Sequence, residues 1–157
     1  MKPNIGISPK NIESLVAILS TTLANEVILY MKTRKFHWNV SGESFIELHK
    51  FFEEQYIEIE EVIDEVAERI IKIGGKVIGT TKEFTKLSIV KEFPGEYPNP
   101  KEMIKELLND HELIIKQLRD YIEVCSEKLK DAGTTDLLTK LIQIHETIAW
   151  KLRRYLS

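Results

Sequence analysis

The chain has 157 residues, of which 43% are hydrophobic and 30% charged, with 7 glycines and 5 prolines. This composition predicts one ordered, α-rich domain over residues 1–157, with a flexible tail over residues 1–7, and argues against a disordered or fibrous protein. The net charge of −3 gives no general reason to bind nucleic acid or an anionic membrane.

Cys125 is the only cysteine, which excludes an internal disulfide and suits a reducing compartment. It falls on the apolar side of its predicted helix, so we interpret it as an inert core thiol rather than a nucleophile. We expect no signal peptide, no apolar run of membrane length and no membrane partner. The predicted location is therefore the cytoplasm.

The first helix is expected to begin after Ser8, which can cap it, with Pro9 in the first helical position. Apolar residues then recur every three or four positions to about Phe36, as on the buried side of a helix. Glu26 lies among them. It either forms a salt bridge to a neighbouring helix, which we favour, or supports a metal ligand from behind.

A second helix is predicted over residues 45–73. Ser44 and Glu47 have the spacing of a capping box at its start, and Gly74-Gly75 is typical of its end. The following connection, 76–98, is rich in glycine and proline and contains a short helix near residues 81–88. Because this crossover is long, the second and third long helices should run parallel.

The third long helix should begin at Asn99-Pro100 and end at Ala132-Gly133, with Thr134 or Thr135 capping the fourth. Together these patterns predict an all-α four-helix bundle with a short extra helix in the connection between helices two and three. Two histidines lie on the apolar sides of the last two helices. We interpret both as hydrogen-bonded core or boundary residues and not as ligands: His111 and His145.

Four metal-binding residue types lie on one side of the second helix. When the sequence is placed on a helix, they fall within roughly 100° of its circumference: His49, Glu53, Asp64 and Glu68. Apolar residues adjoin this stripe, so it should be partly buried, and buried carboxylates need a partner or a cation. Imidazole combined with carboxylate suits iron, manganese or zinc. The alternative is a purely structural polar stripe.

A single copy of this helix cannot close a metal site. Glu53 and Asp64 are 11 positions apart, or about 16 Å along the helix. The Glu-x-x-His motif of an ordinary di-iron bundle is absent from the sequence. Metal ligands must therefore come from elsewhere.

A two-fold dimer solves this problem, because residue i of one copy then meets residue j of the other. The pairs His49 with Glu68 and Glu53 with Asp64 share one midpoint in the sequence. Antiparallel copies crossing at that midpoint would form two identical sites. His37, which precedes a short turn, can fold back beside His49 and complete each site.

Several motifs resemble those of the Dps family, the mini-ferritins known as DNA-binding proteins from starved cells. The similarity covers nearly the whole chain. The motifs are Lys35-Phe36-His37-Trp38-Asn39-Val40, Phe45-x-x-Leu48-His49, Phe52-Glu53-Glu54-Gln55-Tyr56, Asp64-Glu65-x-Ala67-Glu68-Arg69, Thr135-Asp136-Leu137-Leu138-Thr139 and His145-Glu146-x-x-Ala149-Trp150-x-Leu152-Arg153.

The resemblance implies a ferritin-like four-helix subunit that acts as a ferroxidase and iron store. Two-fold dimers would build a shell of twelve subunits, with two iron ions, or zinc as a substitute, at each site between subunits. His37 and His49 would come from one subunit and Asp64 and Glu68 from its mate, while Glu53 stands where the family uses Asp or Glu. The implied reaction oxidises Fe²⁺ with H₂O₂ in preference to O₂ and deposits a ferric mineral in the cavity, which protects against oxidative damage.

The resemblance gives two further residues a role. Trp38 matches an aromatic residue beside the centre that shields or quenches oxidising intermediates; the alternative is that it only fills core space. Asp136 matches an acidic position in the pore through which iron passes, with Glu127 and Asp131 adding negative potential nearby. The alternative for Asp136 is a charge that complements the dipole of the last helix.

A second functional hypothesis is a DNA-binding protein of the nucleoid in which the metal site is secondary. The N-terminal segment offers only Lys2 and Lys10, and the C-terminal helix adds a small basic patch at Lys151, Arg153 and Arg154. So few cations release too few counterions for strong binding at physiological salt. We therefore expect DNA binding to be weak or absent.

Overall fold

The computed structural model describes residues 3–157, so the first two residues of the expected tail lie outside the described part of the chain. The helices are α1 (Pro9–Asn39), α2 (Phe45–Lys72), α3 (Thr81–Leu87), α4 (Pro100–Glu123), the π-helical turn η1 (Val124–Lys128) and α5 (Ala132–Leu156). Residues 3–7 precede α1 without regular structure, and Pro3 lies against Gly74. The all-α prediction is confirmed.

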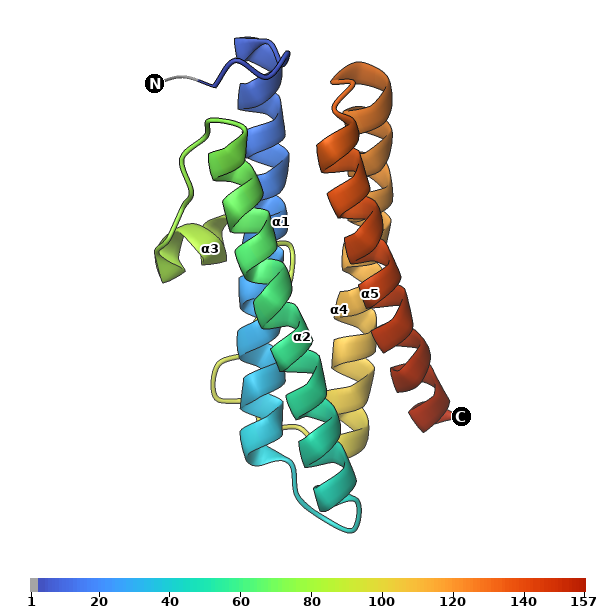
Figure 1. The fold of residues 1–157 in the computed structure, drawn as a ribbon. Coiled ribbons are helices and arrows are strands. Elements are labelled where there is room, and N and C mark those ends of the chain that lie inside the picture. The colour runs from blue at the N-terminus through green and yellow to red at the C-terminus, as the bar shows by residue number, and fades with distance from the viewer. Residues whose placement is uncertain (1–2) are drawn as a thin grey trace.

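The four long helices form two antiparallel pairs, α1 with α2 and α4 with α5, that pack side by side (Figure 1). The segment between α2 and α4, which includes α3, crosses the length of the bundle beside α1. As a result α2 and α4 point in the same direction, as the long connection predicted. A cluster of buried leucine, isoleucine, valine and phenylalanine side chains fills the space between the helices.

Most helix ends follow the predicted local signals. Ser8 and Asn99 accept hydrogen bonds from the backbone N–H groups at the starts of α1 and α4. Thr80 and Glu83 form a reciprocal capping box at α3. After α2, Gly74 adopts φ +93°, and the N–H groups of Gly74 and Gly75 donate to carbonyls of the last turn, which is a Schellman motif.

The predicted capping box at the start of α2 is wrong. Ser44 makes no capping hydrogen bond, because its φ/ψ of −92°/21° is not the extended conformation from which a side chain reaches back to the helix. A tight turn, in which the N–H of Phe45 donates to the carbonyl of Gly42, leads into the helix instead. The first helix also runs past Phe36 to Asn39, so His37 is a helical residue.

The predicted boundary between the last two helices is also wrong. Ala132 and Gly133 do not end α4. The α-helix ends at Glu123, and the chain remains helical through the π-helical turn η1. Lys130 then reverses the chain direction with φ 51°. Thr134 and Thr135 do not cap α5, because Asp131 does so by accepting a hydrogen bond from the Thr134 N–H.

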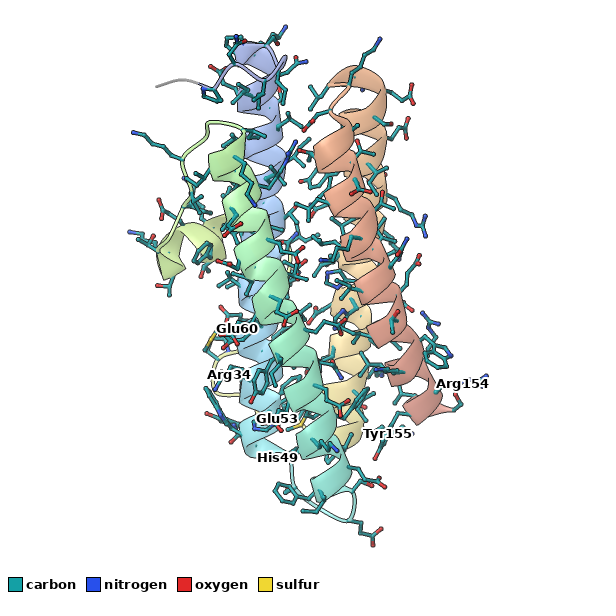
Figure 2. All side chains as sticks on the ribbon, viewed as in Figure 1. Arg34, His49, Glu53, Glu60, Arg154 and Tyr155 are labelled. Atoms are coloured by element: carbon teal, nitrogen blue, oxygen red, sulfur yellow. The ribbon has the colours of Figure 1, made fainter. Side chains whose placement is uncertain are left out.

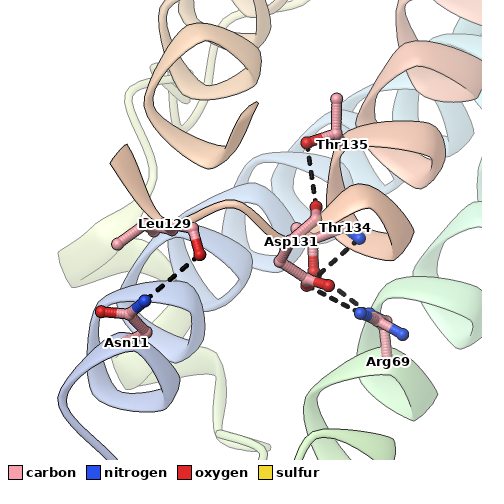
Figure 3. A network of polar contacts seen from close by, with 6 residues as sticks. All are labelled: Asn11, Arg69, Leu129, Asp131, Thr134 and Thr135. Atoms are coloured by element: carbon pink, nitrogen blue, oxygen red, sulfur yellow. Dashed lines mark hydrogen bonds and ion pairs between the residues drawn. The ribbon is translucent and has the colours of Figure 1, made fainter. Parts of the chain in front are cut away.

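Asp131 is held by more than its own helix (Figure 3). Its carboxylate accepts a hydrogen bond from the Arg69 guanidinium of α2 at 2.7 Å, and Arg69 Nε donates to the Thr134 hydroxyl. On the other side of the turn, the Asn11 amide of α1 donates to the carbonyl of Leu129. These contacts tie three helices to the turn and explain why α5 begins where it does.

The apolar character of α1 was underestimated from the sequence. Contrary to expectation, this helix contains a stretch long and apolar enough to cross a membrane, as judged by length and composition. In the folded chain 61% of that stretch is buried inside the protein. A core helix of a bundle meets the same criteria, so the feature is explained by packing against the other helices.

Replacing Asp131 with alanine should lower the free energy of unfolding by about 2 kcal/mol, since it removes a helix cap and a partly buried charged hydrogen bond. Burial raises the pKa of Asp131, but the hydrogen bonds from Thr134 and Arg69 outweigh it and hold that pKa below its usual value. The contribution is therefore complete at neutral pH, and it fades as the pH falls below about 4.

Urea denaturation of the parent and Asp131→Ala at pH 7 and pH 3 measures this difference. Glu127→Ala, an exposed carboxylate in the preceding turn, is the control and should leave stability unchanged. Equal stability of parent and Asp131→Ala at pH 7, or a gap of the same size at pH 3, would contradict the account.

Candidate metal centre

His37 and His49 form a reciprocal pair between the end of α1 and the start of α2. Their rings stack with centroids 3.7 Å apart and planes at 22°. Nδ1 of His37 lies 2.7 Å from the backbone oxygen of His49, and Nδ1 of His49 lies 2.9 Å from the backbone oxygen of His37. The short turn after α1 therefore brings together the two histidines that the sequence predicted to be neighbours.

These hydrogen bonds determine which ring nitrogen can bind a metal. A backbone oxygen can only accept, so each Nδ1 must carry the proton and donate it. In a neutral imidazole the other nitrogen, Nε2, then has a free lone pair. Histidine ligands of metals are commonly oriented in this way, by a hydrogen bond from the second ring nitrogen.

Glu53 lies one helical turn beyond His49 on α2 and is half-buried. The Tyr56 hydroxyl lies 3.3 Å from its Oε1 and donates to it. Burial, followed by the charge of Glu53, raises the pKa of Tyr56, so its hydroxyl keeps the proton that it donates. Figure 2 shows Glu53 and His49 at the same end of the α1–α2 pair.

Asp64 and Glu68 lie farther along α2, and both are exposed. Glu68 pairs with Lys72 at 2.6 Å, a solvent-exposed contact of the kind that contributes little to stability. Because α2 is unbroken from Phe45 to Lys72, the distance from Glu53 to Asp64 is about 16 Å. The stripe is therefore half-buried at its His49 end and open at the other.

One chain thus places its candidate ligands in two separate groups. Within residues 3–157, no three histidine, cysteine or acidic side chains converge closely enough to hold a metal ion. The first group combines two imidazoles with Glu53, and the second consists of two carboxylates. Neither group resembles a closed coordination sphere for iron, which takes mixed nitrogen and oxygen ligands.

Trp38 is not a core residue, because 57% of its surface is exposed. The core-filling alternative is therefore wrong. Its ring packs under the guanidinium of Arg34, whose Cζ lies 5.2 Å from the ring centroid. The same guanidinium covers the rings of Tyr30 and Tyr56 at 5.5 and 4.5 Å. Sequence reasoning missed this aromatic cluster beside the histidine pair, although Tyr30 and Arg34 are one helical turn apart.

The three predicted pore residues, Asp136, Glu127 and Asp131, differ in exposure and in ion pairing. Asp136 is exposed on α5 and lines a shallow open depression with Gly133 and Thr139. It lies beyond the first turn of α5, which contains no acidic residue, so the helix-dipole explanation is not supported. Asp131 is committed to Arg69 and cannot add free negative potential, whereas Glu127 is exposed.

A buried polar chain crosses the bundle from α1 to α4. Glu26 Oε1 lies 2.8 Å from His145 Nε2, and His145 Nδ1 lies 2.8 Å from His111 Nδ1. All three residues are at most 1% exposed, while Glu26 Oε2 and His111 Nε2 have no hydrogen-bond partner among residues 3–157. The predictions that both histidines are hydrogen-bonded core residues and that Glu26 pairs with another helix are confirmed.

The remaining buried groups have structural roles. Cys125 is fully buried, and burial raises the pKa of its thiol to about 11, which confirms an inert thiol. Lys32 of α1 pairs with Asp110 of α4 at 2.6 Å, and this buried contact joins the two helix pairs.

Comparison with known proteins gives one family model and many relatives. The Ferritin model, described as a ferritin-like domain, matches residues 16–157. A low temperature-induced protein of Nostoc sp. is 39% identical over 154 residues, which cover 98% of this chain and 86% of the relative. DNA protection during starvation protein 2 of Bacillus anthracis is 35% identical, with 92% of this chain and 98% of the relative covered.

Solved structures agree with the fold. Dps from Thermosynechococcus elongatus is 34% identical, with a TM-score of 0.89 over 94% of this chain and 93% of that chain. The Dps protein of Vibrio cholerae O1, described as a member of a broad superfamily of ferritin-like diiron-carboxylate proteins, is 31% identical. Its TM-score is 0.93, over 99% of this chain and 97% of that chain.

The buried chain makes stability depend on pH. Burial, and then the neighbouring His145, lowers the pKa of His111 well below 6.5. Below about pH 6.5 the unfolded chain therefore binds more protons than the folded one, and the free energy of unfolding falls by up to about 1.4 kcal/mol per pH unit for this group.

His111→Gln keeps an N–H donor for His145 but does not titrate, so its urea midpoint should vary less between pH 7 and pH 5 than that of the parent. Asp110, whose pKa burial raises, works in the opposite direction and is present in both proteins. Identical pH slopes for the two proteins would contradict this role of His111.

Proposed function

The chain belongs to the Dps family of ferritin-like proteins, and from this premise we propose that it oxidises ferrous iron at centres shared by two subunits and stores the ferric product. The observation that carries the proposal is the division of the candidate ligands along α2, which is unbroken. His49 and Glu53 lie at one end of the stripe, with His37 of α1 beside them, and Asp64 and Glu68 lie at the other end.

A two-fold partner would complete the ligand set. If two copies of α2 cross antiparallel near the midpoint of the stripe, the carboxylates of one copy approach the imidazoles of the other. The supporting structural facts are the exposure of Asp64 and Glu68 and the free Nε2 atoms of His37 and His49. Glu53 would lie between the groups and supply a further carboxylate ligand.

The proposed chemistry follows from these residue types. The imidazoles bind Fe²⁺ as neutral donors, and the carboxylates stabilise Fe³⁺, which is a harder cation. Two Fe²⁺ ions supply the two electrons that reduce one H₂O₂, with two protons, to two water molecules. Because both reactants are consumed in one step, little hydroxyl radical forms. Dioxygen would serve as a slower oxidant, and Zn²⁺ could occupy the same ligands without reacting.

The proposal includes a shell of twelve subunits built from these dimers, with the ferric mineral inside. Asp136 is exposed in an open depression at the start of α5 and is our candidate for a pore through which Fe²⁺ enters. We expect the protein to act in the cytoplasm.

Protection of DNA by this chain would not require tight binding to DNA. Within the described residues the N-terminal segment contributes only Lys10, and Arg153 in the C-terminal patch already pairs with Glu112. Removal of iron and peroxide is a sufficient protective mechanism. The nucleoid-binding alternative is therefore the weaker one. Removal of iron and peroxide near the nucleoid is compatible with the proposed function.

The native assembly tests the proposal. Fe²⁺ is added anaerobically, H₂O₂ follows, and ferric absorbance should then form in a rapid phase. His37→Ala and Asp64→Ala should each slow the fast phase by at least about tenfold, because each removes a proposed ligand, and loss of mere supporting contacts already costs that much. Circular dichroism should show unchanged helical content.

Glu47→Ala is the matched control, since Glu47 is another exposed carboxylate of α2 that faces away from the stripe. It should leave the fast phase intact. A parent protein without a fast phase, or His37→Ala and Asp64→Ala variants as fast as Glu47→Ala, would contradict the proposal.

A further inference from the structure

Tyr56 of α2 lies where the histidine pair, Glu53 and the aromatic cluster meet. It is 9% exposed. Its hydroxyl donates to Glu53 Oε1, and its ring makes an edge-on contact with His37 at a centroid distance of 5.2 Å. Tyr56 therefore contacts one candidate ligand from α1 and one from α2. We do not assign Tyr56 itself as an iron ligand.

Arg34 packs over the face of the Tyr56 ring. Its guanidinium carbon lies 4.5 Å from the Tyr56 centroid, and its Nη1 donates to the Tyr30 hydroxyl at 2.7 Å. Tyr30 in turn packs edge-on against Tyr56 at 6.1 Å. Cation–π contacts of this kind stabilise the position of the ring. Arg34, Tyr30 and His37 thus contact the Tyr56 ring, and the Tyr56 hydroxyl donates to the Glu53 carboxylate.

A restraint on Glu53 has a physical purpose. Glutamate has three rotatable side-chain bonds, and each long side chain that is ordered costs free energy. A neutral O–H donor on one carboxylate oxygen restrains the group and leaves the other oxygen free for a metal. Unlike lysine or arginine, it adds no charge that would compete with the cation. At 3.3 Å the hydrogen bond is long, and such contacts commonly tighten when the ligand binds.

We propose that Tyr56 is a positioning residue for Glu53, held in place by Arg34 and Tyr30. This inference rests on the proposed function, because it assumes that Glu53 is a metal ligand. It predicts that loss of the hydroxyl weakens metal binding more than it slows the reaction of bound iron.

Tyr56→Phe in the native assembly tests the inference, since it removes only the hydroxyl and keeps the ring in the cluster. The Fe²⁺ concentration for half-maximal oxidation rate should rise about tenfold. This factor corresponds to the lower end of the range of free energies for a hydrogen bond to a charged group. The maximal rate should change less than the half-saturating concentration. Tyr121→Phe, at a partly buried tyrosine of α4, is the control and should behave as the parent.

Anaerobic Zn²⁺ titration by calorimetry gives a second readout that does not depend on oxidation. Tyr56→Phe should lower Zn²⁺ affinity in the parent but have no further effect in a Glu53→Ala background, because the two side chains act as a unit. Unchanged Zn²⁺ affinity in Tyr56→Phe, or an equal loss in the Glu53→Ala background, would overturn the positioning role.

The two failures are distinguishable. If the parent shows no fast ferric phase, the proposed function fails, whereas the Zn²⁺ titration still decides whether Tyr56 acts through Glu53. If the parent is active and Tyr56→Phe matches it in both assays, only the positioning role fails.

Discussion

The hydrogen bonds that His37 and His49 exchange with each other's backbone are the constraint from which the candidate site follows. They join the last turn of α1 to α2 near its start, and each selects the protonated Nδ1, so that both Nε2 atoms are free acceptors. A histidine pair that is preorganised in this way loses little entropy when a metal binds. It offers only two nitrogen donors, however, and so the remaining ligands must be supplied by carboxylates.

The bundle distributes its polar groups between two very different environments. Glu26, His145 and His111 are enclosed in the core and satisfy one another, apart from one oxygen and one nitrogen. Asp64 and Glu68 are open to solvent on α2. The buried groups can rearrange only at a cost to stability, whereas the exposed carboxylates remain available to a second molecule. This contrast favours an intermolecular metal centre over one inside the bundle.

Much of the fold could be predicted because its signals are local. The apolar periodicity of the helices, the proline and asparagine at the start of α4 and the glycine pair after α2 depend only on neighbouring residues. The turn between η1 and α5 could not be predicted, since it depends on Arg69 and Asn11, which reach it from other helices. Ser44 has the right residue type for a cap, but the turn before it gives the wrong backbone conformation.

The site was predictable to a similar extent. Helical spacing identified the stripe on α2, and the turn after α1 suggested that His37 approaches His49, as it does. The cluster of Arg34 with Tyr30, Trp38 and Tyr56 was missed because no motif marks it. It arises from the side-by-side packing of α1 and α2.

The central claim is that each metal centre draws ligands from two subunits, and mixed assemblies test it most directly. When His37→Ala and Asp64→Ala chains are co-expressed and pair at random, half of the dimers are mixed. Each mixed dimer has one site with both substitutions and one with neither. The account predicts recovery of about a quarter of the parent's fast ferroxidase phase in mixed shells, from two variants that each lack this fast rate when alone. No recovery above the separate variants would contradict it.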